Sequence, residues 1–495
     1  MNFADAISTH VPDAPAFISR GDTTTWGELR DQVAALRGGL AGLGVGPGQR
    51  VALVCANNWY FVASYLASLG VGATVVPLNP QSPAPELARE IEQVGARVVI
   101  AGPTGRRNLQ QLAPEELARL EVVVLCGEAS IPGSVSLDDL LSADPVDIVD
   151  CPSDTPAALL FTSGTAGSRK AAILTHANLK AAAETVLSSP GRLGSQDRAY
   201  GILPLYHVFG LAVLLGAALM GGSSVLLVER FDPDAALESI AHWGLTVVLG
   251  PPTMWAALAA QPGAAPDALA SVRVAVSGAA RLPVSVATAV HEKFGIELAE
   301  GYGLTETTSV VASASGLGAP AGSIGRPLTG VEMRLVDSEG DDVYVGDEGE
   351  ILVKGPTVFA GYWDDPEATQ SVLTAEGWLH TGDVGLIDDD GWLYLVDRLK
   401  DLIIVSGFNV HPAEVESVLR EHPAVVEAAV VGVAHPHTGE AVRAYVVVGQ
   451  GGAEENDVIE FVGERLARYK CPSKINFVEE IPTGMGGKIL RRELR

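Results

Sequence analysis

The sequence contains few cysteines and little positive charge. Its four cysteines, Cys55, Cys126, Cys151 and Cys471, are far apart, and no Cys-x-x-Cys pair occurs. A clustered zinc site is therefore not expected, and the low count is typical of a reducing cytoplasm. The chain has 33 Lys and Arg against 60 Asp and Glu, a net charge of −27. Because phosphate backbones and anionic membranes would be repelled, this charge argues against nucleic-acid partners and against non-specific membrane docking.

The sequence also has no signal-peptide pattern and no clear membrane span. Its start, MNFADAISTHVPDAPAF, has no basic region followed by an apolar one. Between Gly201 and Val228 there is no Asp, Glu, Lys or Arg, and this length approaches a membrane span. However, Pro204 and the run Gly221–Ser224 interrupt the segment. We therefore expect a buried helix near Leu211–Met220, a turn, and a core strand at Val225–Val228.

The composition describes an ordered protein with more than one folding unit. A chain of 495 residues, 47% hydrophobic and 19% charged, is expected to form roughly two to four units. Short β-branched or leucine-rich runs alternate with longer amphipathic stretches, which predicts an α/β fold with helices and mostly parallel sheets. The expected strands are 50–55, 74–77, 97–101, 121–126, 223–228, 246–249 and 272–277, and the expected helices include 26–43, 85–94 and 233–243.

The pattern changes after Val331. The segments EMRLVD, GEILVKG and GWLYLVD indicate short strands between acidic, glycine-rich turns, hence a small antiparallel or barrel-like subdomain. We expect a large N-terminal α/β domain, residues 1–397, whose β-rich subdomain covers about 320–397, and a small mobile α+β C-terminal domain, residues 398–495. The C-terminal elements are predicted as strands at 401–407, 425–433, 443–449 and 474–480 and helices at 411–422 and 458–467.

One stretch, FTSGTAGSRK at residues 161–170, consists mostly of residues with small side chains. It follows an apolar strand, PAALLF, and its glycines let the backbone approach a ligand closely. Consecutive N–H groups, hydroxyls and a lysine can receive phosphate oxygens. The Walker A pattern G-x-x-x-x-G-K-[ST] is absent, and such a stretch taken alone is more often a simple turn.

Five further motifs follow this loop. In chain order they are PLYHVFG (204–210), EGYGLTET (300–307), TGD (381–383), DRLKDLIIVSGFNVHPAEVE (397–416) and PTGMGGKILRREL (482–494). Together with the loop, they resemble the adenylate-forming superfamily of acyl-CoA synthetases, 4-coumarate CoA ligases, luciferases and peptide-synthetase adenylation domains. The likeness is closest to fatty-acid and 4-coumarate CoA ligases and spans the chain from about Trp26 to Arg495.

The resemblance implies an ATP-dependent acyl-CoA synthetase that uses Mg²⁺ and coenzyme A. A carboxylate is a poor acyl donor, because it is stabilised by resonance and its leaving group would be oxide. Its attack on the α-phosphate of ATP gives an acyl-AMP and pyrophosphate, and the thiol of CoA then displaces AMP. Because two anions must meet in the first step, catalysis depends chiefly on positioning and on cationic and N–H stabilisation.

The resemblance also implies roles for residues of the nucleotide site. Glu306 would lie near Mg²⁺, a hard cation that prefers carboxylate and phosphate oxygens, and Thr305 would bond a phosphate oxygen. Tyr302 would stack on adenine, while Asp383 and Arg398 would bind the ribose hydroxyls. The phosphate loop and the surroundings of the nucleotide would include Thr162, Ser163, Gly164, Thr165, Gly167, Lys170, Ala279, Glu300 and Gly301.

Four more residues acquire roles from the resemblance. Lys488 would touch both the substrate carboxylate and the α-phosphate, although a lysine between glycines and a basic tail is ordinarily a solvated surface residue. Lys400 matches the hinge of the C-terminal domain, and Gly407 would let the pantetheine arm of CoA pass close to the backbone. His207 would line the acyl site, whereas a histidine on an apolar segment is by default buried and satisfied by one hydrogen bond.

The sequence departs from the family pattern at several positions. Ala166 stands where threonine is usual, and Arg169 stands where proline is common. One lost hydroxyl contact is worth about 0.5–1.5 kcal/mol, so weaker ATP binding is expected but not inactivity. Gly487 replaces serine or threonine and should loosen the catalytic loop. Arg281 replaces a frequent proline, either as a surface residue or as a contact to a second carboxylate; Ile404 replaces a lysine of some relatives, which disfavours luciferase-like oxidation.

The sequence leaves the acid substrate open. Small residues such as Gly210, Gly216 and Gly278 leave room for a medium or long fatty acid, which is the favoured interpretation, or for an aryl or phenylpropanoid acid. The motifs are also consistent with transfer of the acyl group from acyl-AMP to a carrier protein, and with a non-catalytic acyl or nucleotide binder. The expected partners are small molecules in the cytoplasm, without an integral membrane segment, and the oligomeric state is open, with a homodimer among the options.

Overall fold

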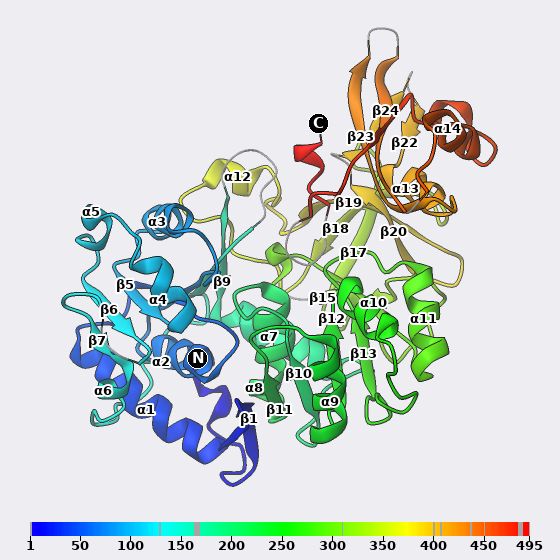
Figure 1. The fold of residues 1–495 in the computed structure, drawn as a ribbon. Coiled ribbons are helices and arrows are strands. Elements are labelled where there is room, and N and C mark those ends of the chain that lie inside the picture. Colours follow the sequence, from blue (N-terminus) through cyan, green and yellow to red (C-terminus); the bar gives the residue numbers. More distant parts are fainter. Residues whose placement is uncertain are drawn as a thin grey trace.

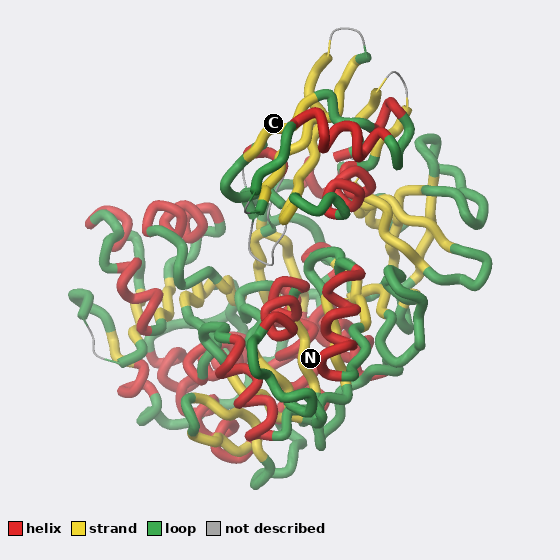
Figure 2. The backbone as a smooth tube through the Cα atoms, turned by 45° about the vertical axis from the view of Figure 1, so that its right-hand side comes forward, coloured by secondary structure: helices red, strands yellow, loops and turns green. Residues whose placement is uncertain are grey.

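The chain folds into a large body and a smaller C-terminal unit that lies over one side of it (Figure 1). This computed structural model describes residues 2–127, 130–162, 169–308, 310–398, 401–405, 408–435, 438–449, 451–483 and 489–494. Figure 2 shows the same division from a second direction, with helices and strands mixed throughout the body. Four sheets organise the described residues.

The first sheet has seven strands in the order β7-β6-β5-β3-β4-β8-β9. Every neighbouring pair is parallel except β8 with β9. β4 and β5 are buried along their whole length, as central parallel strands between helices require. The strands expected at 50–55, 74–77, 97–101 and 121–126 are confirmed as β3, β4, β5 and β6. The bounds are β3 (Arg50–Val54), β4 (Thr74–Pro77), β5 (Val98–Ala101), β6 (Val122–Leu125), β7 (Val135–Ser136), β8 (Pro156–Phe161) and β9 (Ala171–Thr175).

The second sheet has nine strands in the order β16-β15-β14-β13-β12-β10-β11-β1-β2. Its central strands run parallel, and antiparallel pairs close both edges. The strands expected at 223–228, 246–249 and 272–277 are confirmed as β11, β12 and β13, with ends shifted by one or two residues. The bounds are β1 (Pro15–Ser19), β2 (Asp22–Thr25), β10 (Arg198–Gly201), β11 (Ser224–Leu227), β12 (Val247–Gly250), β13 (Val274–Ser277), β14 (Ala299–Gly303), β15 (Val310–Ser313) and β16 (Arg326–Pro327).

Helices cover these two sheets. The capping of α1 (Trp26–Gly42) is local: the Thr25 hydroxyl accepts from the Glu28 N–H, and a Glu28 carboxylate oxygen accepts from the Thr25 N–H at 2.8 Å. The helices expected at 26–43, 85–94 and 233–243 are confirmed as α1, α3 and α9. Besides α1, the bounds are η1 (Phe3–Ile7), α2 (Trp59–Gly70), α3 (Ala84–Gln93), α4 (Pro103–Leu109), α5 (Pro114–Leu117), α6 (Leu137–Leu140), α7 (His176–Ser188), α9 (Pro233–Trp243), α10 (Pro252–Ala260), α11 (Val284–Phe294), η3 (Thr305–Thr307) and α12 (Pro366–Gln370).

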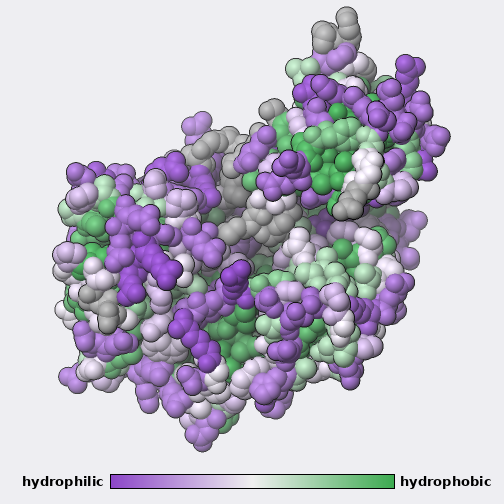
Figure 3. All heavy atoms as spheres, viewed as in Figure 1, coloured by the Kyte–Doolittle hydropathy of each residue, from purple (hydrophilic) through white to green (hydrophobic). Residues whose placement is uncertain are grey.

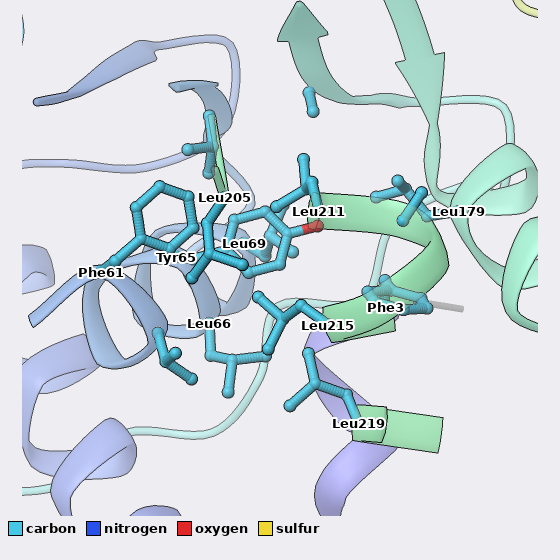
Figure 4. Packing of buried hydrophobic residues seen from close by; sticks show 14 of the residues in the cluster. Phe3, Phe61, Tyr65, Leu66, Leu69, Leu179, Leu205, Leu211, Leu215 and Leu219 are labelled. Atoms are coloured by element: carbon cyan, nitrogen blue, oxygen red, sulfur yellow. The ribbon is translucent and has the colours of Figure 1, made fainter. Parts of the chain in front are cut away.

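The uncharged segment between Gly201 and Val228 is packed inside the body. It forms a π-helix, η2 (Phe209–Gly216), a short helix, α8 (Ala217–Gly221), and then β11. Figure 4 shows Leu211, Leu215 and Leu219 directed toward the aromatic and leucine side chains of α2. The expected helix therefore exists but begins two residues early and starts as a π-helix, which apolar periodicity could not distinguish. Along the described stretches, no helix is long and apolar enough to cross a membrane.

The third sheet is antiparallel, with the order β17-β18-β19-β20. This confirms the β-rich subdomain in its antiparallel form. Among the described strands no pair joins β17 to β20, so the sheet is open and not a closed barrel. The strand β19 was not expected; it contains Asp383. The bounds are β17 (Glu332–Val336), β18 (Gly349–Lys354), β19 (Leu379–Ile387) and β20 (Leu393–Arg398).

The C-terminal unit is an α+β sandwich with the strand order β22-β21-β24-β23, and β25 pairs with β24. Its expected elements are present, but the last helix was misplaced: it covers Glu455–Gly463 and not 458–467. Glu455 and Asp457 occupy its first turn, where the helix dipole favours negative charge. The bounds are β21 (Ile403–Val405), β22 (Phe408–Val410), β23 (Val425–His435), β24 (Gly439–Val448), β25 (Lys474–Phe477), α13 (Pro412–Arg420), α14 (Glu455–Gly463), η5 (Arg468–Lys470) and η6 (Arg491–Glu493).

The surface agrees with the charge of the sequence. In Figure 3 hydrophilic residues cover much of the visible face, and hydrophobic residues gather in smaller areas between them. Such a surface suits a chain with a net charge of −27.

Candidate active site

A pocket lies at the carboxyl ends of β12, β13 and β14. Ligands of open α/β sheets bind in this position. Leu249, Val274 and Val276 of the strands form one wall, and Phe209 and Val213 of η2 form another. None of the described residues that line the pocket is Asp, Glu, Lys or Arg. The pocket can therefore receive an apolar group, and it offers no charged partner to a second carboxylate.

The turn after β13 brings the backbone close to this pocket. Ala279 lines the pocket and adopts a φ of 68°, a left-handed conformation that is uncommon for a residue with a side chain. The buried Glu300 supports the turn, because its Oε2 accepts a hydrogen bond of 3.1 Å from the Leu282 N–H. Burial raises the pKa of Glu300. At Gly278 an added Cβ would lie 2.9 Å from Cε1 of Phe209, so only glycine leaves that ring in place.

Two of the residues expected at the nucleotide are hydrogen bonded to each other. The Tyr302 hydroxyl donates to Oδ2 of Asp383 at 2.8 Å, although the two residues are 81 positions apart. Both are buried, at 6% and 4% exposure. Tyr302 comes from β14 and Asp383 from β19, so this bond joins the second sheet to the third. Tyr302 and Gly301 also line the pocket, which places the expected adenine and acid regions side by side.

A second cluster forms around Glu306, at the start of the segment after β14. The Tyr362 hydroxyl donates to its Oε1 at 2.7 Å, and the Lys170 ammonium lies 5.0 Å from the centre of the Tyr362 ring. Burial and then the charge of Glu306 raise the pKa of Tyr362, so its hydroxyl stays protonated and remains a donor. Sequence reasoning missed Tyr362. Its signal was weak, a tyrosine between Gly361 and Trp363, 56 residues from its partner.

The backbone explains how Tyr362 reaches this place. The segment 359–363 adds to the edge of β9: the Ile173 N–H donates to Gly361 O at 2.9 Å, and the Trp363 N–H donates to Ala171 O at 2.8 Å. The Phe359 N–H also donates to the carbonyl oxygen of Glu306 at 2.9 Å. The same few residues thus hold both the strand that follows the phosphate loop and the residue expected at the metal.

The loop expected to bind phosphate, residues 161–170, is described only at its ends. The Thr162 N–H donates to Lys170 O at 2.8 Å, so the two flanks of the loop are paired. Arg169, which replaces the usual proline, lies 2.5 Å from Glu86 and 2.6 Å from Glu90 on α3. The expected phosphate-binding residues Ser163, Gly164, Thr165 and Gly167 lie outside the described residues, as does Ala166.

Several other expected residues can be placed only in part. His207 lines the pocket and is exposed, so the default of a buried histidine is wrong. Thr305 is half-buried in η3 beside Glu306. Arg281 is exposed and is not among the lining residues of the pocket, which fits its interpretation as a surface residue. Lys400, Gly407, Gly487 and Lys488 lie outside the described residues, and of Arg398 only the backbone, paired with Asp383, is described.

The donor set at Glu306 fits a magnesium ion carried by a phosphate ligand. No group of three or more His, Cys, Asp and Glu side chains gathers to hold a metal in the part of the chain that the structure describes. Mg²⁺ usually keeps several waters and binds through one or two carboxylates plus substrate phosphates. A single carboxylate, oriented by Tyr362 through one of its oxygens, meets this requirement.

Comparisons with known proteins agree with this geometry. The family model of the AMP-binding enzymes matches residues 3–363, and that of the AMP-binding enzyme C-terminal domain matches residues 414–488. A feruloyl-CoA synthase from Amycolatopsis sp is 37% identical over 98% of this chain and 96% of the relative. A long-chain-fatty-acid–CoA ligase from Yersinia pestis is 33% identical over 98% of this chain and 91% of the relative.

The fold is also that of solved structures. ATP-bound MatB from Rhodopseudomonas palustris is 32% identical and superposes with a TM-score of 0.92, covering 100% of this chain and 98% of that one. The apo form of the same protein superposes with a TM-score of 0.80. The overall arrangement of this chain is thus closer to the ATP-bound form than to the apo form.

The chain therefore belongs to the AMP-binding enzyme family. The expected resemblance to adenylate-forming enzymes and the expected α/β architecture are confirmed. The chain is an acid–thiol ligase that uses ATP, and ATP and CoA are substrates of its family.

Proposed function

We propose that this enzyme joins an aromatic carboxylic acid of the phenylpropanoid type to coenzyme A. In the first half-reaction a carboxylate oxygen bonds to the α-phosphorus of ATP, and pyrophosphate leaves. In the second the CoA sulfur bonds to the acyl carbon, its proton passes to solvent, and AMP leaves. The observation that carries the choice of acid is the pocket beside Tyr302: its described lining has no Asp, Glu, Lys or Arg and includes Gly278, Gly301 and Gly303.

The shape of the pocket favours a planar ring. Gly278, Gly301 and Gly303 present no side chain to it, so this wall is close to flat, and the Phe209 ring lies on the Gly278 side. Aromatic rings gain from offset or edge-to-face contact with such a partner. Ser189, Ser313 and Ser315 add hydroxyls to the lining, and these suit a phenolic or methoxy oxygen on the ring. The name of the feruloyl-CoA synthase relative supports the same class of acid.

A medium or long fatty acid is the second candidate. The valine and leucine side chains of the lining would accept an alkyl chain as readily as a ring, and some relatives carry names of long-chain-fatty-acid ligases. The two candidates differ at the serines: Ser189 Oγ donates to Val186 O at 2.7 Å and Ser313 Oγ accepts from the Ser315 N–H at 3.1 Å, and their remaining hydrogen-bonding capacity can be used by a ring oxygen but not by an alkyl chain. A polar site that finds no partner on the ligand loses affinity.

We propose the following roles for the site residues. Lys488 bridges the substrate carboxylate and the α-phosphate, and Glu306, oriented by Tyr362, holds Mg²⁺, which supplies charge neutralisation on the phosphates. Tyr302 and Asp383 bind adenosine as one hydrogen-bonded unit. His207, exposed at the pocket, separates the acid from the nucleotide. The remaining nucleotide-binding assignments, and a hinge at Lys400 between domains 1–397 and 398–495, belong to the same proposal.

A panel of acids tests the substrate. AMP release would be measured with 4-hydroxycinnamate, unsubstituted cinnamate, benzoate and fatty acids of eight to sixteen carbons. We expect kcat/KM to be highest for the hydroxylated cinnamate and about tenfold lower for unsubstituted cinnamate, the effect of one hydrogen bond to the ring oxygen. A preference for a fatty acid would contradict the aromatic assignment and leave the ligase activity intact.

The acceptor and the activity itself are tested separately. Labelled acid would be supplied together with either CoA or a carrier protein bearing phosphopantetheine. We expect a thioester to form with CoA and not with the carrier protein. Acid-dependent exchange of labelled pyrophosphate into ATP isolates the first half-reaction. A protein that only binds acyl or nucleotide ligands would show no exchange with any acid, and that result would overturn the proposal.

A further inference from the structure

The C-terminal tail contains a buried arginine that bonds to three separate segments. Arg491 has a side chain that is 15% exposed. Its Nη2 donates to Oε1 of Glu416 on α13 at 2.7 Å, its Nε donates to Val430 O on β23 at 3.1 Å, and its Nη1 lies 3.5 Å from Oδ2 of Asp401. The planar guanidinium is suited to such divergent contacts, because its five donors have fixed directions.

The partner carboxylates depend on this arginine. Glu416 has a side chain that is 5% exposed, and its Oε1 also accepts from the Val430 N–H at 2.8 Å. Burial raises the pKa of Glu416, while the charges of Arg491 and Arg420 act against that rise. Burial also opposes the charge of Arg491, but Glu416, Asp397 and Asp401 more than offset it and raise its pKa. A buried carboxylate without such a partner would be strongly destabilised.

Asp401 connects this network to the segment in which the hinge is expected. Asp401 directly follows Lys400, the expected hinge, and Asp397 precedes it by three residues. Asp397 is itself fixed to the C-terminal unit, because its Oδ2 accepts from the Ala413 N–H at the start of α13 at 3.0 Å. Arg491 thus interacts with carboxylates on both sides of residues 398–400. It contacts Asp401, and the charge of Asp397 raises its pKa.

The tail is also held on both flanks of residues 484–488, which lie outside the described residues. Thr483 and Ile489 form an antiparallel bridge, and the Leu490 N–H donates to Pro482 O at 2.8 Å. Ile481 and Leu494 are buried in one cluster with residues of β23. Figure 1 shows the red tail beside β23, where the chain ends. In the sequence, Arg491 follows Lys488, the expected catalytic lysine, by three residues.

We propose that Arg491 is a positioning residue that couples the tail bearing Lys488 to the hinge segment at Lys400. The proposal rests on the proposed function. Arg491 of the tail contacts Asp401, the residue after the expected hinge, so we expect the two segments to move together. Loosening this bond should harm the half-reaction that needs Lys488 and spare the one that does not.

The test compares the two half-reactions in the full-length enzyme. For Arg491→Met we expect pyrophosphate exchange to fall about 100-fold, because a misplacement of about 1 Å has that effect on a positioned group. Thioester formation from supplied acyl-AMP and CoA should change by less than about threefold. Arg491→Lys keeps the positive charge but lacks the planar set of donors, so we expect its pyrophosphate exchange to lie between that of Arg491→Met and the wild type. The remaining defect should appear in kcat, and KM for ATP should be unchanged.

Two further variants keep the result interpretable. Arg420→Met removes the other cation near Glu416. Nη2 of Arg420 lies 3.6 Å from Oε2 of Glu416, and Arg420 contacts neither the tail nor Asp401 in any described interaction. It is the matched control and should leave the ratio of the two half-reactions unchanged. Asp401→Asn keeps the size of the side chain and weakens its contact with Arg491, so it carries the same test if Arg491→Met fails to fold. It should lower exchange about tenfold and spare the thioester step.

The outcomes separate this inference from the function beneath it. An equal loss in both half-reactions for Asp401→Asn and Arg491→Lys, or no loss of exchange, would overturn the coupling while the ligase activity stands. A wild-type enzyme that exchanges no pyrophosphate with any acid would overturn the proposed function and the coupling with it.

Discussion

The two halves of the candidate active site are built in different ways. On the side proposed to bind the nucleotide, polar groups hold one another: the Tyr302 hydroxyl donates to Asp383 at 2.8 Å, and the Tyr362 hydroxyl donates to Glu306 at 2.7 Å. On the acid side, apolar side chains and the bare backbone of glycines such as Gly278 form the walls. Polar pairs fix direction, whereas apolar walls select by shape.

This difference predicts how the halves respond to change. A substitution on the nucleotide side should slow the reaction of every acid by a similar factor, since all acids share ATP. A substitution on the acid side should change the order of preference among acids and leave the binding of ATP unaltered. The three changes below examine this contrast, starting with the largest effect.

Glu306→Gln should have the largest effect. The amide oxygen can still accept the Tyr362 hydroxyl, but the charge expected to meet Mg²⁺ is lost. We expect kcat for pyrophosphate exchange to fall about 100-fold for aromatic and fatty acids alike, the usual cost of one electrostatic group at a transition state. Glu86→Gln, the same change on α3 outside the pocket, is the control. If the fall in kcat differed between aromatic and fatty acids, the proposed separation of the nucleotide and acid sides would be wrong.

Gly278→Val should have an intermediate effect confined to the acid. The new side chain would start 2.9 Å from Phe209 Cε1, so this ring, which lines the pocket, must shift. Overpacking of this kind costs about 2 kcal/mol, and KM for a ring-bearing acid should rise about 30-fold while KM for ATP stays the same. Gly278→Ala should give a smaller rise in the same direction. Equal rises of both KM values would show that this glycine serves the fold and not the pocket.

Tyr362→Phe should have the smallest effect. The ring that faces Lys170 at 5.0 Å remains, and only the hydroxyl bonded to Glu306 is removed. The loss of one hydrogen bond from the buried Tyr362 to the half-buried Glu306 carboxylate should lower kcat about fivefold for every acid and raise the Mg²⁺ requirement. A titration of exchange against Mg²⁺ measures both. Because the pKa of Tyr362 is raised, its hydroxyl stays protonated at neutral pH, and the pH profile should be the same in both enzymes near pH 7.

Much of the architecture was predictable because it depends on local pattern. The strand β4 and the helix α9 have the bounds that their β-branched and amphipathic runs predict. Errors occurred where a local rule competed with another: α14 begins at acidic residues that the apolar pattern did not include, and η2 opens as a π-helix against α2. Such choices depend on capping charge and on packing partners, which hydrophobic periodicity does not report.

The sequence predicted which residues belong to the candidate site better than it predicted which of them are in contact. The motif EGYGLTET indicated Tyr302 and Glu306, and TGD indicated Asp383, but no motif showed that Tyr302 and Asp383 touch. Tyr362 and Arg491 were missed as site residues. Tyr362 reaches Glu306 because its segment adds to the edge of β9, and Arg491 reaches Glu416 from 75 residues away. Contacts at such separations leave no period in the sequence.

The sequence by itself determined the class of enzyme, the alternation of strands and helices, and the residue types available to ATP and an acid, because spacing and propensity act over a few neighbouring residues. Only the tertiary structure decided which of these residues meet. It paired Tyr302 with Asp383 and Tyr362 with Glu306, and it joined Arg491 to Asp401 beside the proposed hinge. The physical reason is that these bonds form between separate sheets and segments, whose approach depends on the packing of the whole core.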